Sequence, residues 1–134
     1  MDGILGRYSP YIYALLRIVV GFLFFIHGMQ KVFNIPPAAQ AMPPSTMFTV
    51  IGIFEIIAGL MIMVGFFASI PAFIASGMLA VGYFMVHQPM GALPISNMGE
   101  PAVLFCFIFL YIAARGSGPL SIDSAMRGTE TRSR

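Results

Sequence analysis

The sequence predicts an all-α fold: a bundle of four transmembrane helices with the N- and C-termini on the cytoplasmic side, forming one membrane domain over residues 1–134. Hydrophobic residues make up 58% of the chain and charged residues 9%, whereas about a quarter of a soluble domain is charged. The apolar residues fall into four runs, separated by connectors rich in Pro and Gly. Most arginines lie in the two tails, which is typical of cytoplasmic segments.

The first predicted span covers residues 11–33, and about 20 residues suffice to cross a hydrocarbon core of roughly 30 Å. Tyr11 and Tyr13 at its start suit the headgroup boundary. Pro36 and Pro37 follow its end and cannot continue a helix. Because no small-residue cleavage site follows the apolar run, we expect a retained span rather than a signal peptide.

The second predicted span covers residues 46–67, with Ser45 as its N-cap and Glu55 at its centre. Gly52 and Gly59 lie about one helical turn from this acid, so a neighbouring backbone can approach the carboxylate closely. A carboxylate in hydrocarbon needs a partner, because burial of an unpaired charge is costly. We therefore expect Glu55 to contact the first span.

Two further spans are predicted at residues 71–87 and 98–115. The apolar run 102–114 of the fourth span is short for a full crossing, but its capped first turn and Arg115 extend it to near bilayer thickness. Asn97 is expected to cap the fourth helix, with Glu100 completing a capping box. The segment 119–134 is a polar tail, and the part after Asp123 is expected to be mobile. Four crossings place both termini on one side of the membrane, and the arginine bias makes that side cytoplasmic.

Ionisable and polar side chains in these spans are the candidates for an intramembrane polar pocket. In the first span, Arg17 and Lys31 share one helical face with Gly21 and Gly28, and His27 lies at the edge of this face. Phe22 and Phe25 are among the side chains expected to face lipid or an oligomer partner. The full set of candidates is Arg17, His27, Lys31, Glu55, His87, Asn97 and Glu100.

Two interpretations of these residues remain open. They are buried ion pairs and hydrogen bonds that specify which helices pack together, or they line a pocket for a small ligand, a quinone headgroup or a proton. We expect Glu55 to meet Arg17 or His27. Arg17 also has a long stem that reaches the cytoplasmic boundary or Asp123, and Lys31 can extend outward in the same way.

Several function classes are disfavoured by composition. A metal is not expected, because two histidines and two carboxylates on three helices show no ligand spacing. Cys106 is the only cysteine, which excludes an internal disulfide and a CxxC redox pair. Nucleic acid is not an expected partner, since no basic stripe with interleaved aromatic residues is present. No haem, flavin or iron–sulfur motif is evident, so a bound quinone is the redox cofactor we consider.

Three motifs, in this order, resemble the DoxX family of small four-helix membrane proteins. They are R-x-x-x-G-x-x-F-x-x-H-G-x-x-K at residues 17–31, G-x-x-E-x-x-x-G at 52–59 and G-S-G-P-L-S-I-D at 116–123, and N-x-G-E at 97–100 also fits. The resemblance implies a bacterial inner-membrane protein whose founding relatives are subunits of a thiosulfate:quinone oxidoreductase. Other members of the family are linked to redox-stress complexes.

The function hypotheses therefore come from different classes, and no catalytic residue is assigned. The first is a redox-associated subunit that binds a quinone-like or other small ligand, with His27 and Glu55 handling protons. The second is a non-catalytic scaffold that docks partner proteins in the bilayer. A small transporter is a third, weakened by the lack of an inverted repeat. Expected partners are the lipid bilayer, redox proteins and a second copy of the chain.

Overall fold

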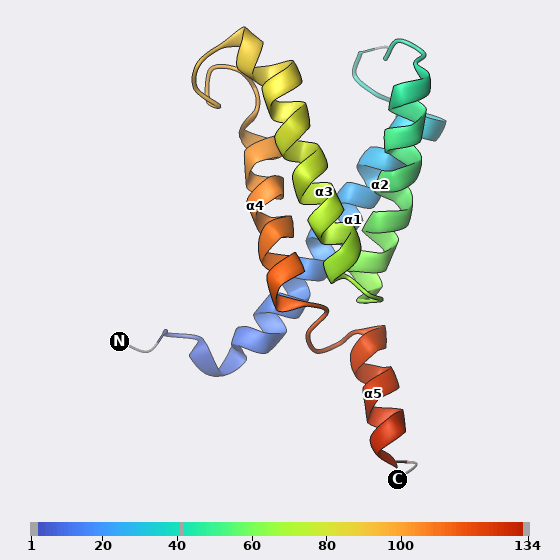
Figure 1. Cartoon of the computed structure of the whole chain (residues 1–134), viewed down its shortest axis with the longest axis vertical. Helices are drawn as coiled ribbons and strands as arrows, with labels where there is room; N and C mark the ends of the chain where they lie inside the picture. The colour runs from blue at the N-terminus through green and yellow to red at the C-terminus, as the bar shows by residue number, and fades with distance from the viewer. Residues whose placement is uncertain (1–2, 41, 133–134) are drawn as a thin grey trace. The chain divides into compact units, whose positions relative to one another are not determined.

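The computed structural model describes residues 3–40 and 42–132, and every regular element among them is a helix (Figure 1). The all-α class predicted from the sequence is confirmed. In chain order the elements are the 3₁₀ turn η1 (Gly6–Tyr8), α1 (Ser9–Phe33), α2 (Thr46–Val64), α3 (Ser69–Gly82), the π-helical turn η2 (Tyr83–His87), the 3₁₀ turn η3 (Gln88–Met90), α4 (Glu100–Arg115) and α5 (Ile122–Arg132).

The first two helices begin and end where local chemistry allows. Pro10 lies in the first turn of α1, where its missing N–H costs nothing. Asn34, which follows α1, has a φ of 54°, and Gly65, which follows α2, has a φ of 71°, so a left-handed residue stops each helix. Ser45 occupies the predicted N-cap of α2 but makes no side-chain capping bond. The second helix is thus shorter than the predicted 46–67, because a left-handed glycine ends it.

The fourth helix starts differently from the prediction. Its N-cap is Gly99, and no side chain caps it. The predicted capping box of Asn97 and Glu100 is therefore wrong. Asn97 precedes the helix by more than one position and uses its side-chain oxygen to accept a hydrogen bond from the N–H of Gly99, at 2.9 Å. This leaves Glu100 exposed in the first turn, where an acid still favours the helix dipole.

The C-terminal segment forms the helix α5 up to Arg132, which the sequence analysis did not predict, whereas the mobility of this tail stays a prediction. Ser121 precedes α5, and its hydroxyl accepts a hydrogen bond from the N–H of Ser124 at 3.1 Å. The N–H of Ser121 donates in return to the Ser124 hydroxyl at 3.2 Å. This reciprocal capping offsets the poor helix propensity of the sequence that follows.

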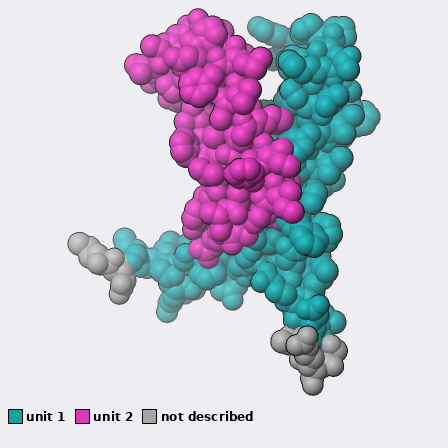
Figure 2. Space-filling model, viewed as in Figure 1, with its two compact units in different colours: residues 1–67, 117–134 teal, residues 68–116 magenta. Residues whose placement is uncertain are grey.

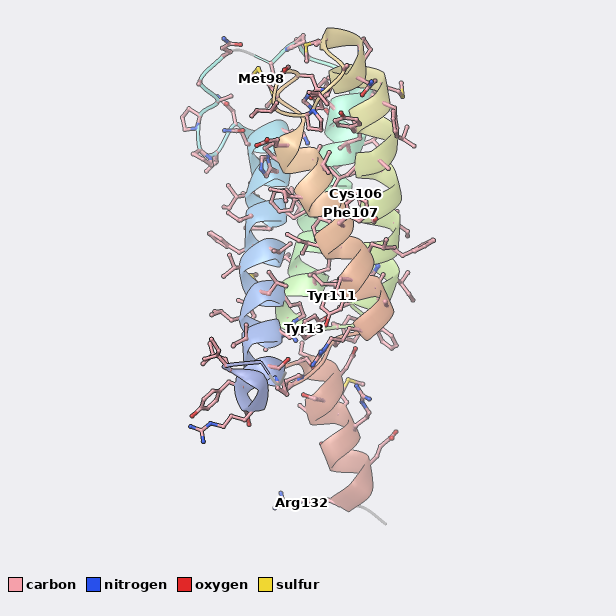
Figure 3. All side chains as sticks on the ribbon, turned by 90° about the vertical axis from the view of Figure 1, so that its left-hand side faces the viewer. Tyr13, Met98, Cys106, Phe107, Tyr111 and Arg132 are labelled. Atoms are coloured by element: carbon pink, nitrogen blue, oxygen red, sulfur yellow. The ribbon has the colours of Figure 1, made fainter. Side chains whose placement is uncertain are left out.

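Three helical stretches in the described part of the chain are long and apolar enough to cross a membrane: Gly6–Phe33, Thr46–Val64 and Ser69–Met90. Large apolar side chains such as Phe22 and Phe84 are exposed on them, which suits contact with lipid. The helix α4 has 16 residues, a length of about 24 Å, and carries exposed Phe107 (Figure 3). These features define a membrane protein in a lipid bilayer.

The chain divides into two compact units (Figure 2). Unit 1 contains α1, α2 and the C-terminal segment with α5, and unit 2 contains α3, η2, η3 and α4. Within unit 2, the Ser76 hydroxyl on α3 donates to the Cys106 carbonyl on α4 at 2.8 Å, and the Cys106 thiol donates back to the Ser76 carbonyl at 3.3 Å. Cys106 is thereby engaged in helix pairing.

Candidate functional site

Unit 1 is built on a seam of four glycines between α1 and α2. A Cβ atom added to Gly21 would lie 2.9 Å from the carbonyl oxygen of Gly59, and one added to Gly28 would lie 2.5 Å from that of Gly52. The backbones touch there, and a larger residue would force them apart. The sequence-based expectation that Gly52 and Gly59 admit a neighbouring helix beside Glu55 is confirmed.

Lys31 and Glu55 form an ion pair beside this seam. The Lys31 Nζ lies 2.5 Å from Glu55 Oε1, and the side chains are 20% and 4% exposed. The second carboxylate oxygen, Oε2, is buried and has no hydrogen-bond partner among the described residues. An unsatisfied buried acceptor costs about 1–3 kcal/mol, so the pair is electrically balanced but incompletely hydrogen-bonded.

This geometry corrects one prediction and confirms another. Glu55 does contact the first helix, as expected, but its ion-pair partner is Lys31 rather than Arg17 or His27. Arg17 lies two turns away at the level of Ile62, because the glycine seam sets the register of the two helices. Lys31 consequently turns inward to Glu55, as its place on the same helical face as Arg17 predicts, and the alternative that it extends outward to the boundary is not the one found.

Arg17 is fully buried and is held by backbone carbonyls. Its Nε donates to Ile62 O at 3.1 Å, and Nη2 donates to Leu120 O at 2.7 Å. Nη1 donates to Ser117 O and, at 3.0 Å, to Pro119 O. The planar guanidinium thus connects α1 with the end of α2 and with the segment before α5.

The C-terminal segment is folded to suit this arginine. Gly118 and Leu120 have φ values of 66° and 52°, and these left-handed residues turn successive carbonyls toward one point. Asp123 holds the segment in place, since its carboxylate accepts hydrogen bonds from the Ser117 hydroxyl at 2.6 Å and from the Phe67 N–H at 3.0 Å. The alternative that Arg17 pairs directly with Asp123 is replaced by a network in which both bind the same segment.

The remaining candidates fall in different places. His27 is exposed, unlike Arg17, Gly21 and Gly28, which are buried on the same helix. Its angle of about 80° from Arg17 puts it at the margin of the buried face, and the prediction that it faces the bundle interior or its openings stays a prediction. Glu100 is exposed as well. Neither side chain joins the Lys31–Glu55 ion pair.

Asn97 and His87 meet within unit 2, together with Tyr83, which the sequence analysis did not single out as a site residue. Asn97 is 1% exposed, and its Nδ2 donates to Tyr83 OH at 3.1 Å and to Gly91 O at 3.0 Å. His87 Nδ1 lies 3.0 Å from Asn97 O. The i, i+4 spacing of Tyr83 and His87 was the signal that could have found this cluster.

No three His, Cys, Asp or Glu side chains lie close enough to hold a metal ion in residues 3–40 and 42–132. The chemistry of the two clusters is instead that of hydrogen bonding and charge. In unit 1, the ion pair offers one free carboxylate oxygen as an acceptor and ammonium hydrogens as donors. In unit 2, the hydrogen bond of His87 Nδ1 to the Asn97 carbonyl leaves Nε2 of the neutral imidazole as an acceptor.

An all-helical membrane chain in which Lys31 pairs with the buried Glu55 and Arg17 is fully buried is a small integral membrane protein with polar side chains inside its helix packing. The sequence model of the DoxX family matches residues 12–88, and the chain belongs to this family. It is also 36% identical over 126 residues to an uncharacterized protein of Haemophilus influenzae, a match that covers 90% of this chain and 94% of that relative. No solved structure matches the chain.

Proposed function

We propose that the chain crosses the bacterial inner membrane four times, through α1, α2, α3 and α4, with both termini in the cytoplasm. Support comes from the two junctions with unit 2. The chain leaves unit 1 after Phe67 and returns at Ser117, and both are hydrogen-bonded to Asp123. The junctions therefore lie at one end of unit 1. If α3 crosses the membrane outward, α4 must cross it back.

The shortness of α4 is compatible with a crossing. Bilayers thin locally around a short helix, and a basic residue at its end extends to the headgroups. Arg115 ends α4 and is exposed. Arg7, Arg127 and Arg132 lie in the two tails, and positively charged tails favour the cytoplasmic side.

We further propose that the Lys31–Glu55 pair is the polar centre of a redox-associated membrane subunit, where a quinone-like or other small ligand binds. The observation that carries this proposal is the buried Oε2 of Glu55, which lacks a donor. If Glu55 had only a structural role, we would expect both carboxylate oxygens to be hydrogen-bonded within the protein, because a buried polar group that lacks a partner is costly. A ligand O–H or N–H supplies the missing donor.

Quinone chemistry fits both members of the pair. The Lys31 ammonium has three hydrogens, and one is given to Glu55, so the others can donate to a quinone carbonyl. The free Oε2 of Glu55 can accept a hydrogen bond from a hydroquinone hydroxyl. The chain itself supplies binding and hydrogen bonds in this proposal, and electrons come from a redox-protein partner. The resemblance to subunits of a thiosulfate:quinone oxidoreductase agrees with this division of roles.

Binding of a short-chain benzoquinone to the purified protein in detergent tests this function. Saturation at 100 times Kd stabilises the folded state by about 2.7 kcal/mol, which raises the melting temperature by several degrees. The matched variant replaces the pair with apolar residues, Lys31→Met with Glu55→Leu, and should show no such rise. Equal rises in the melting temperatures of both proteins would show that the quinone binds at a place other than the Lys31–Glu55 pair. No rise in either, with proteins that co-purify, would favour the scaffold alternative.

A further inference from the structure

The hydrogen bond of His87 fixes which tautomer its neutral ring adopts. Its Nδ1 lies 3.0 Å from the backbone oxygen of Asn97, and a carbonyl oxygen only accepts. Nδ1 therefore carries a hydrogen, and the neutral imidazole has its lone pair on Nε2. No described residue donates a hydrogen bond to this Nε2. The ring thus presents an acceptor without a donor.

The surrounding residues hold the ring in this orientation. Tyr83 and His87 lie on one π-helical turn with their rings stacked at 6.1 Å and an interplanar angle of 26°. Asn97, the acceptor of the Nδ1 hydrogen, is buried and anchored by three hydrogen bonds of its own side chain. Gly99 packs against the Tyr83 ring, where an added Cβ would lie 2.5 Å from Cε2. Single π-helical turns of this kind are frequent at functional sites.

The neighbourhood favours an aromatic ligand. His87 is half-buried and lies near the end of the apolar stretch Ser69–Met90, at the depth where amphipathic rings partition. Tyr83 flanks the imidazole, and the Phe84 ring, which is 66% exposed, lies edge-on to Tyr83 at 5.3 Å. A phenolic O–H is a stronger donor than an aliphatic one, and its ring packs favourably on such aromatic side chains.

We propose that the tip of the α3–α4 hairpin is a binding site for an aromatic hydroxyl compound, whose O–H donates to His87 Nε2. Tyr83 and Asn97 are positioning residues for this nitrogen. The site stands within unit 2 and does not depend on whether the Lys31–Glu55 pair binds a ligand.

Nitrogen NMR of histidine-labelled protein in detergent micelles tests the proposal on the intact chain. The protein has two histidines, so His27→Gln leaves only the His87 signals and assigns them. Phenol is the probe, and anisole is its matched control because it has the ring and the oxygen but no O–H. Anisole also controls for partitioning of the probe into the micelle.

We expect the neutral ring to carry its hydrogen on Nδ1, and phenol but not anisole to shift the Nε2 resonance of His87 saturably. Tyr83→Phe, which keeps the ring and removes the hydrogen bond from Asn97, should weaken phenol binding by up to about tenfold through loss of ring positioning. A hydrogen on Nε2 in the free protein would overturn the proposal. So would equal shifts with phenol and anisole, or no shift up to the solubility of phenol.

Discussion

Lys31 and Glu55 meet although they do not lie at the same height on their helices. A Cβ added to Gly52 would lie 2.9 Å from the Lys31 Cβ, so Lys31 is level with Gly52 and lies about one helical turn, roughly 5 Å, from Glu55 along the axis. Helical side chains lean toward the N-terminus of their own helix. Because α1 and α2 are antiparallel, the two side chains lean toward each other, and Nζ reaches 2.5 Å from Oε1.

Removal of one member of this pair should cost more than removal of both. Lys31→Met leaves Glu55 buried and uncompensated, and we expect a loss of about 2–4 kcal/mol, seen as a lower melting temperature in detergent. The double variant Lys31→Met with Glu55→Leu should recover most of this loss, since apolar replacements of buried pairs are often neutral. Single and double variants that melt alike would show that the two side chains are not coupled.

Arg17 should be the residue that holds the C-terminal segment to α1 and α2. Arg17→Met removes four hydrogen bonds to backbone carbonyls, two of them to Pro119 and Leu120. We expect the segment from 117 to 132 to become sensitive to proteases, with little rescue by Arg17→Lys, because lysine lacks the planar fork.

The control for this experiment is Arg115→Met, which removes an exposed arginine that donates to the Tyr111 hydroxyl on the same helix. It should leave the protease pattern unchanged. Arg17→Met with wild-type protease resistance would mean that Asp123 alone retains the segment.

The close helix contact at the glycine seam predicts that a Gly→Ala substitution destabilises the protein at some positions and not at others. A Cβ at Gly59 would lie 2.5 Å from the backbone nitrogen of Phe25, whereas one at Gly77 meets nothing within 4 Å. Gly59→Ala should destabilise the protein by about 1–3 kcal/mol through overpacking. Gly77→Ala should be neutral or slightly stabilising, because alanine is the better helix former. Equal melting temperatures for the two variants would argue against close helix contact at Gly59.

The proposed topology is testable by labelling of single cysteines from outside the cell. After Cys106→Ala, cysteines at Ala39 and Ala92 report on the connectors between α1 and α2 and between α3 and α4, and one at Gly128 reports on α5. We expect an impermeant thiol reagent to label Ala39Cys and Ala92Cys, but Gly128Cys only after permeabilisation. Labelling of all three from one side, or of Ala39Cys and Ala92Cys from opposite sides, would exclude four crossings.

The sequence predicted the all-α class well because hydrophobic runs and proline breaks act locally. The inward face of α1 followed from helical phase, since Arg17 and Lys31 are separated by close to a whole number of turns. The partner of Glu55 depended on the register between α1 and α2. The helical phase of each sequence tells which face is buried, but not how far one helix is shifted along the other. The glycines at 21, 28, 52 and 59 held that information as equal spacings on two helices, but only the contacts reveal which glycine faces which.

The part of the Arg17 network that lies in the C-terminal segment could not be predicted from the sequence, for another reason. The carbonyls that bind Arg17 belong to backbone at Ser117, Pro119 and Leu120, and no side-chain pattern marks a backbone acceptor. The serine pair at 121 and 124 was a readable capping signal for α5. Tyr83 was similarly readable from its spacing to His87, although the π-helical turn that joins them was not.

The most direct test of the central claim, that the Lys31–Glu55 pair binds a ligand, requires no prior guess of the compound. Wild-type protein and the double variant Lys31→Met with Glu55→Leu are purified in parallel, and their bound small molecules are extracted and compared by mass spectrometry. We predict one compound that is retained in near-stoichiometric amount by the wild type and is absent from the variant. Identical extracts from two folded proteins would contradict the claim and leave the pair a structural element of the α1–α2 interface.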